Sequence, residues 1–270
     1  MTYKNDEISS IEDEGFVIIQ PIQYNRYGWN KDNDDTRDIH FIPSDNIVFN
    51  RKFSLRKNMP PVLNQGKLGS CTSSSICNAI SFCEIINNKN TYRPKSILFN
   101  YYNQREMNGY INEDLGASIR NSIKSINKHG VCFEETWPYD ITQFTEKPPP
   151  NCYKEARNHK IVKYERISPN INDIKSAIIS GFPVIFGFIV FDSIEKPTTT
   201  RSGIIPIPSS NSKKLGGHCV LCCGWDDSRR LFEIMNSWGT EWGNNGYGWI
   251  SYDYIINSKL SSDFWKITLV

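Results

Sequence analysis

Long apolar runs are absent from this sequence of 270 residues. A helix that crosses a membrane needs roughly 17–25 consecutive apolar residues, and no stretch approaches that length, so we expect no transmembrane segment. Residues 1–15 are polar and acidic and lack the apolar core of a secretory signal peptide. We therefore expect an intracellular, cytoplasmic protein. Asn, Ile and Lys, whose codons are AT-rich, are abundant, which points to an AT-rich genome such as that of a protist or a large virus.

Excess charge of either sign is also missing. The 31 Lys and Arg residues nearly balance the 29 Asp and Glu residues, which gives a formal net charge of +2. The basic residues are scattered, so we expect no nucleic-acid and no membrane partner. Paired Cys-x-x-Cys elements are missing too, because Cys219 and Cys222 form a single such spacing inside a strand-like run. We expect neither a metal nor an organic cofactor.

The stretch Gln65–Cys71 has the composition of a turn that leads into a helix. Asn64 and two glycines favour the turn, Ser70 is a preferred helix cap, and apolar residues recur at helical spacing after Cys71. A cysteine on the first turn of a helix lies in a positive field that favours the thiolate. The turn can bring the amide of Gln65 beside the sulfur. The stretch therefore predicts a nucleophile with an oxyanion donor next to it.

Three motifs together resemble those of papain-like cysteine peptidases. The first is Gln65–Cys71 (Gln-Gly-x-x-Gly-Ser-Cys), and the second is Gly217–Val220 (Gly-His-Cys-Val). The third is Asn236–Tyr247 (Asn-Ser-Trp-Gly-Thr-x-Trp-Gly-x-x-Gly-Tyr). Their order along the chain fits the family, with the cysteine first and the histidine and asparagine far downstream. The resemblance covers the chain from about Asn58 to the C-terminus.

The resemblance implies a role for each of five residues. Cys71 would be the nucleophile, and His218 would stabilise the thiolate as a cation and then protonate the leaving amine. Asn236 would hold the imidazole ring in orientation. Gln65 would donate to the oxyanion together with the backbone N–H of Cys71. Trp238 would cover the hydrogen bond between Asn236 and His218.

Four residues are expected to contact the substrate. Leu115 and Gly116 lie where the family has a glycine-containing wall, along which an extended peptide pairs through its backbone. Gly217 and Trp238 flank the expected catalytic residues. We expect polypeptide substrates and a monomeric protein.

The eight cysteines are predicted to be mostly reduced. Secreted relatives usually carry a cysteine three residues before the nucleophile, as part of a disulfide framework. Leu68 occupies that position here. Buried free thiols are typical of an intracellular setting.

The hydrophobic periodicity changes along the chain and predicts an α+β fold. Helical patterns dominate residues 58–160, with Ser96 and Gly130 at helix ends, and β patterns dominate residues 161–270. The resemblance implies the papain-like two-lobe fold, in which a helical half with the nucleophile faces a β-barrel-like half with His and Asn across a cleft. Residues 148–150 should form a stiff connector, and residues 192–216 a long polar loop beside the site.

Residues 1–57 form an N-terminal extension before these two halves. Within it, Glu14–Ile19 is expected to be a short strand. The segment Gly28–Asp38 resembles one that precedes the core in bacterial-type members of the family, which lack a long helical propeptide. One interpretation is a surface extension anchored by Trp29.

A second interpretation of the extension is a strap across the cleft. Residues 1–50 would then restrain the enzyme through an intramolecular contact and make the chain a zymogen. The stretch Gln20–Tyr27 could pair with the backbone near Gly116 as a substrate would.

The leading prediction is a cysteine-type endopeptidase. An exopeptidase or an acyltransferase on the same fold is an alternative, in which residues 192–216 could block one end of the cleft. A non-catalytic interaction protein is the other alternative, and the complete set of Gln65, Cys71, His218 and Asn236 argues against it.

Overall fold

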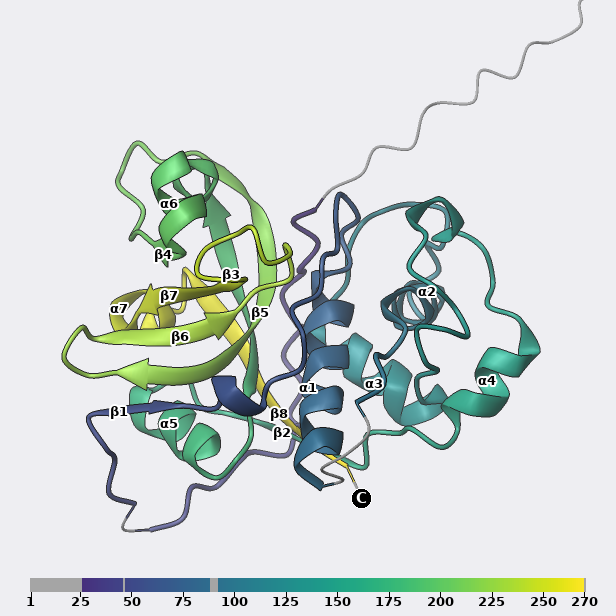
Figure 1. Cartoon of the computed structure of the whole chain (residues 1–270), viewed down its shortest axis with the longest axis horizontal. Helices are drawn as coiled ribbons and strands as arrows, with labels where there is room; N and C mark the ends of the chain where they lie inside the picture. The colour runs from purple at the N-terminus through teal and green to yellow at the C-terminus, as the bar shows by residue number, and fades with distance from the viewer. Residues whose placement is uncertain (1–25, 46, 88–91, 270) are drawn as a thin grey trace, which may run out of the picture.

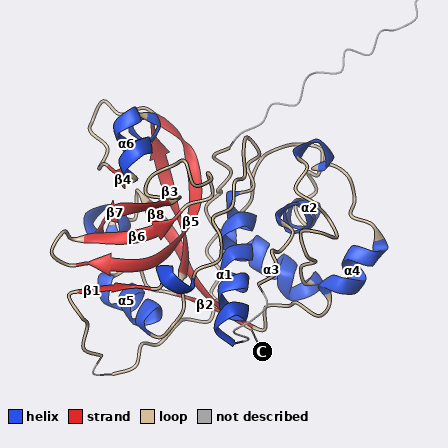
Figure 2. Cartoon of the chain, in the orientation of Figure 1, coloured by secondary structure: helices blue, strands red, loops and turns tan. Residues whose placement is uncertain are grey.

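The computed structural model describes residues 26–45, 47–87 and 92–269. The helices α2, α3 and α4 gather on one side, and the sheet lies on the other with α5, α6 and α7 around it, with α1 between the two sides (Figures 1 and 2). This is the predicted α+β two-lobe arrangement. The helices are α1 (Cys71–Asn87), α2 (Ile97–Glu106), α3 (Ile119–His129), α4 (Pro150–Ala156), α5 (Ile171–Ile179), α6 (Pro197–Ser202) and α7 (Tyr252–Ile256). The strands are β1 (Lys52–Ser54), β2 (Lys163–Arg166), β3 (Val184–Phe191), β4 (Ile204–Ile205), β5 (Lys214–Asp226), β6 (Leu231–Met235), β7 (Tyr247–Ser251) and β8 (Ser261–Thr268).

The helix α1 is the element on which the two sides meet. Its residues from Cys71 to Cys83 are all buried, because β5, β8, α2 and α3 pack around it. Small side chains such as Ser73 and Ala79 let these neighbours approach closely. The start of α1 is therefore fixed against the sheet, and Cys71 with it.

The start of α2 and the end of α3 lie where the sequence predicted them. Ser96 Oγ accepts a hydrogen bond from the Phe99 N–H at 3.1 Å at the start of α2, and Gly130 ends α3 with φ at 80°. The expectation of a connector at residues 148–150 is wrong at its last residue, since Pro150 begins α4. Proline suits a first helical position because its fixed φ is helical and no N–H is needed there.

One sheet contains the eight strands of the described residues. The order is β2-β8-β3-β5-β6-β7-β4, with β1 paired to β5. Neighbours are antiparallel, except that β4 and β7 run parallel. The long strand β5 carries His218, and β6 ends one residue before Asn236. These two neighbouring strands therefore bring the histidine and the asparagine to one place.

One expectation about the connections needs correction. Residues 192–216 are not a loop: they contain a short 3-10 helix at Asp192–Glu195, the helix α6, the strand β4 and the start of β5. Pro197 begins α6, and Gly203, at φ 69°, ends it. The predicted extension 1–57 contributes β1 to the sheet, while the expected strand Glu14–Ile19 lies outside the described residues.

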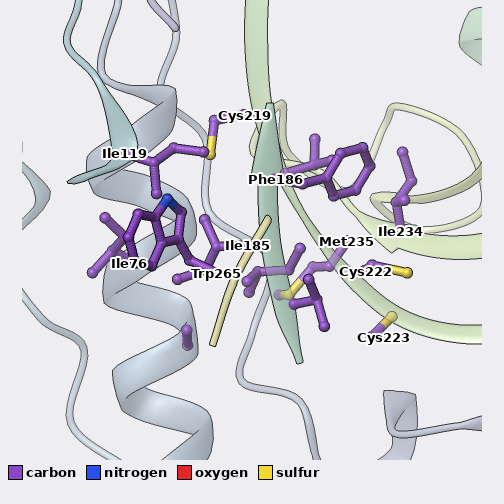
Figure 3. Close-up of a cluster of buried hydrophobic side chains, with 14 of the residues drawn as sticks. Ile76, Ile119, Ile185, Phe186, Cys219, Cys222, Cys223, Ile234, Met235 and Trp265 are labelled. Carbon is purple, nitrogen blue, oxygen red and sulfur yellow. The ribbon is translucent and has the colours of Figure 1, made fainter. Parts of the chain in front are cut away.

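The largest hydrophobic core fills the space between α1 and the sheet. Ile76 from α1, Ile185 from β3 and Trp265 from β8 lie together there (Figure 3), and all three are buried. All eight cysteines are buried free thiols. Within the described ranges, no helix combines the length and the apolar composition needed to cross a membrane.

Candidate active site

The turn before α1 is held by side chains from the helical half. Gly66 adopts φ 59°, in the left-handed region that glycine tolerates. Ser70 was expected to cap α1, but its Oγ lies 2.6 Å from Tyr139 Oη instead. Tyr139 Oη also donates to the carbonyl of Gln65 at 2.9 Å. The turn and Cys71 are therefore tied to a residue that the sequence did not identify.

The side chain of Gln65 is fixed at both ends of its amide. Its Oε1 accepts from Ser237 Oγ at 2.6 Å. Its Nε2 donates to the Leu68 carbonyl at 2.9 Å and to the Arg26 carbonyl at 3.0 Å. One N–H thus holds the turn, and the other holds a backbone carbonyl of the N-terminal segment, in the manner expected for a substrate carbonyl.

His218 and Asn236 form a buried hydrogen-bonded pair. Their atoms Nε2 and Oδ1 are 2.7 Å apart. Because an amide oxygen can only accept, the proton of the neutral imidazole is on Nε2, and Nδ1 is left with a free lone pair. Nδ1 has no hydrogen-bond partner among the described residues. The ring of Trp238 stacks on His218 with centroids 4.5 Å apart and covers the pair from one side.

Backbone contacts bring Cys71 next to His218. The backbone N–H of Cys219, the residue after His218, lies near enough to the Cys71 sulfur to lower the pKa of the thiol. One turn further along α1, Ser75 Oγ donates to the Cys219 carbonyl at 3.0 Å. The first turn of α1 and the middle of β5 are therefore joined, so the thiol and the imidazole come from facing walls.

The protonation of this pair differs from the expectation. Burial raises the pKa of the Cys71 thiol to about 11, although backbone N–H groups, that of Gly28 among them, lower it in part. Burial also lowers the pKa of His218 to about 3. The sequence argument weighed the positive field at the helix start but not the chain that covers the site. Burial therefore favours the neutral thiol and the neutral imidazole over a thiolate and an imidazolium while the site is covered.

The chain that covers the site is the strap, residues 26–41. Its cleft segment, Arg26–Asn30, pairs with both walls. Trp29 N donates to the Gly217 carbonyl at 3.0 Å, Ala117 N donates to the Gly28 carbonyl at 2.8 Å, and Asn30 N donates to the Ala117 carbonyl at 3.0 Å. The stretch Gln20–Tyr27 was predicted to pair with the backbone near Gly116. Its residues 20–25 lie outside the described residues.

Glycines allow the cleft segment to lie this deep. A Cβ on Gly116 would lie 1.9 Å from the Gly28 carbonyl oxygen, and a Cβ on Gly28 would lie 2.0 Å from the Gly69 carbonyl oxygen. The indole of Trp29 fills a space that β3 leaves open, since a Cβ on Gly187 would come within 1.9 Å of the ring. Side chains at these positions would exclude the segment.

The anchor segment of the strap, Asp32–Phe41, is held by charged side chains. Asp38 pairs with Arg120 of α3 and, at 3.2 Å, with Arg166 of β2. Asp32 accepts from Arg120 N at 3.0 Å and from Trp265 Nε1 at 2.9 Å. The segment therefore bridges the helical half and the sheet.

The four expected substrate-contacting residues all lie along the cleft segment. Gly217 and Gly116 contact it through the backbone. The carbonyl of Leu115 accepts from Asn30 Nδ2 at 2.8 Å, while its side chain is exposed. Tyr27 meets the ring of Trp238 edge-on at 6.1 Å. Ala117, which makes two of the backbone bonds, was not predicted, because a non-glycine residue after Gly116 gave no signal.

Comparisons with known proteins identify the class to which this fold and site belong. Residues 49–264 match the family described as papain family cysteine protease. The chain belongs to this family and is a cysteine peptidase, as its motifs predicted.

Particular relatives agree with this assignment. The chain is 45% identical over 229 residues to an uncharacterized peptidase C1-like protein, L477, of Acanthamoeba polyphaga mimivirus, with 80% of this chain and 73% of that protein aligned. Its structure resembles that of xylellain, a cysteine protease from Xylella fastidiosa, with a TM-score of 0.85 and 37% identity over 94% of this chain and 99% of that one. The fold alone is shared with digestive procathepsin L 3 of Tenebrio molitor, at 18% identity and a TM-score of 0.69, over 91% of this chain and 77% of that one.

Proposed function

We propose that this chain is an endopeptidase in which Cys71 is the nucleophile and His218 the general base and acid. Asn236 orients the imidazole, and Gln65 donates to the oxyanion. The observation that carries the proposal is the hydrogen bond of 2.7 Å from His218 Nε2 to Asn236, which leaves Nδ1 as an acceptor. That lone pair is what a thiol next to it needs in order to lose its proton.

The proposed reaction uses these groups in sequence. His218 Nδ1 takes the thiol proton, and the Cys71 sulfur attacks the peptide carbonyl carbon. Gln65 Nε2 and the Cys71 backbone N–H hold the resulting oxyanion. The imidazolium gives its proton to the leaving amine as the C–N bond breaks. Water, activated by His218, then attacks the thioester, and the carboxylic acid leaves.

Cleavage within a chain, instead of at its end, is supported by the path of the strap. The strap crosses the site as a continuous polypeptide, from Arg26 at the oxyanion donor to Asp32 beyond the Gly217 wall. An exopeptidase blocks one end of its cleft or clamps a terminal charge. Residues 192–216 were the candidate for such a block. Within them, Glu195 contacts the side chain of Tyr27, and a groove of about 350 Å³ stays open beside these two residues.

We further propose that the strap restrains the enzyme. Its cleft segment occupies the two backbone pairing sites and the oxyanion donor that a substrate needs. Because the segment is tethered, its effective concentration exceeds that of most free substrates. Burial by the strap also keeps Cys71 and His218 neutral.

A peptide blocked at both termini tests the proposed function. An endopeptidase hydrolyses it, whereas an exopeptidase does not, and a transferase yields mainly aminolysis product when an amine is added. The Cys71→Ala chain is the control. A chain cut within residues 42–50 no longer tethers the strap to the rest of the enzyme. Absence of any turnover by the intact chain, and also by this cut chain, would favour the non-catalytic alternative.

A further inference from the structure

One peptide group in the turn before Cys71 is held at both of its ends. The carbonyl of Leu68 accepts from Gln65 Nε2 at 2.9 Å. The N–H of Gly69, which belongs to the same peptide group, donates to both carboxylate oxygens of Asp114, at 3.0 and 3.1 Å. Because the peptide group is planar, fixing its N–H also fixes the direction of its carbonyl.

Asp114 connects this turn to the wall along which peptides pair. The side chain of Tyr101, on α2, donates its O–H to the Asp114 carboxylate. The same tyrosine oxygen accepts from Gly116 N at 3.2 Å. Gly69 and Gly116 both touch the backbone of Gly28, so this network joins the two surfaces between which the cleft segment lies.

The surroundings of Asp114 show that it is built into the helical half. Asp114 is only 5% exposed, and Arg105 beside it is fully buried. The guanidinium of Arg105 lies 4.3 Å from the centre of the Tyr101 ring and donates to the carbonyls of Ile111 and Glu113, just before Asp114. The cation offsets the buried negative charge and fixes the loop that carries it.

We infer that Asp114 is a positioning residue for the oxyanion donor, an inference that rests on the proposed role of Gln65. Without the carboxylate, the Gly69 N–H loses its buried acceptor and the peptide group turns toward another partner. The Leu68 carbonyl then no longer holds Gln65 Nε2 in place. Such a displacement reduces the stabilisation of the transition state without removing the thiol.

Asp114→Ala in the full-length chain tests this inference. We expect kcat at saturating peptide, per mole of folded chain, to fall by about 10–10²-fold, since a displacement of about 1 Å costs up to ~10²-fold. Asp114→Asn keeps an oxygen acceptor and should recover most of that loss. Asp140→Asn is the matched control, because Asp140 is an exposed cap in the same half; its kcat should not change.

A double-mutant cycle separates positioning from general stability. If Asp114 acts through Gln65, adding Asp114→Ala to Gln65→Ala lowers kcat no further. Equal losses in both backgrounds, or an unchanged kcat per mole of folded Asp114→Ala chain, would overturn the inference. If Asp114→Ala does not fold, Tyr101→Phe replaces it, with a smaller loss that also disappears in the Gln65→Ala background. An unchanged kcat in Gln65→Ala itself would remove the oxyanion proposal as well, whereas a loss there with none in Asp114→Ala removes only this inference.

Discussion

The two segments of the strap are held by different kinds of contact. The cleft segment, Arg26–Asn30, is bound mainly through backbone groups that bind any extended peptide. The anchor segment, Asp32–Phe41, is bound through carboxylates and guanidinium groups that few other sequences could supply. The cleft segment therefore blocks the active site, whereas the anchor segment holds the strap on the enzyme. A substrate competes with the cleft segment but not with the anchor segment.

Removal of the reacting sulfur should have the largest effect and leave both segments in place. We expect Cys71→Ala to lose activity by roughly 10⁴-fold or more, the usual scale for a nucleophile that acts as part of a unit. His218→Ala should lose about as much, because the thiol then has no base. Hydrolysis of the doubly blocked peptide measures both losses. Turnover near the wild-type level in a Cys71→Ala preparation free of other peptidases would contradict the assignment.

Gln65→Ala affects the chemistry and the cleft segment but not the anchor segment. The loss of one oxyanion donor should lower kcat by about 10²–10³-fold. The Arg26 carbonyl also loses a partner, so the strap should compete less well and the apparent KM should fall. Full steady-state curves separate the two effects. A change in KM alone would mean that Gln65 binds the strap but does not serve the reaction.

Asp38→Asn weakens the contacts of the anchor segment alone. The side chains of Asp38 and Arg120 are 7% and 6% exposed, so the closed state would keep buried, poorly paired guanidinium groups, at a cost of about 3–5 kcal/mol. When the strap leaves, water can reach these groups, so the cost falls on the closed state. We expect kcat/KM to rise roughly tenfold or more.

The matched control for that change is Asp35→Asn on the same strap. Asp35 pairs with Arg37, whose side chain is 83% exposed, and at the longer distance of 3.9 Å with Lys124 of α3, whose side chain is 36% exposed. Such surface pairs contribute about 0–1 kcal/mol. Its activity should stay within a few-fold of wild type. Equal activation by Asp35→Asn and Asp38→Asn would show that the buried pairs do not hold the strap.

Tyr27→Phe should have the smallest effect of this series. It removes the hydrogen bond from Tyr27 to Glu195 and keeps the ring against Trp238. A single hydrogen bond contributes about 0.5–1.5 kcal/mol, so kcat/KM should rise by a few-fold at most. Progress curves with the blocked peptide measure it. A larger rise than for Asp38→Asn would mean that the cleft segment, and not the anchor segment, holds the strap.

The sequence predicted the parts of the site that local motifs carry. The motifs place Cys71, His218 and Asn236 at the start of a helix, on a strand and just after a strand, and the helix cap at Ser96 follows from local chemistry. Asp114, Ala117 and the anchor pairs could not be predicted, because they depend on the packing of segments far apart in the chain.

For a related reason, the sequence did not predict that the pKa of Cys71 is raised and that of His218 lowered. The field at the start of α1 can be derived from local sequence, whereas the burial of Cys71 by Gly28 and its neighbours cannot. Long-range burial outweighs the local field in the closed state.

The rate at which Cys71 is alkylated as a function of pH tests the central claim most directly, with peptide mapping to separate Cys71 from the other seven cysteines. The thiolate reacts, so with the pKa raised to about 11 by burial, the intact chain should react slowly near neutral pH and faster only as the pH rises toward that value. The Asp38→Asn chain should already react rapidly near neutral pH, where Asp35→Asn should follow the intact chain. Identical dependence of the alkylation rate on pH in the intact chain and in Asp38→Asn would contradict the claim that the strap keeps Cys71 unreactive.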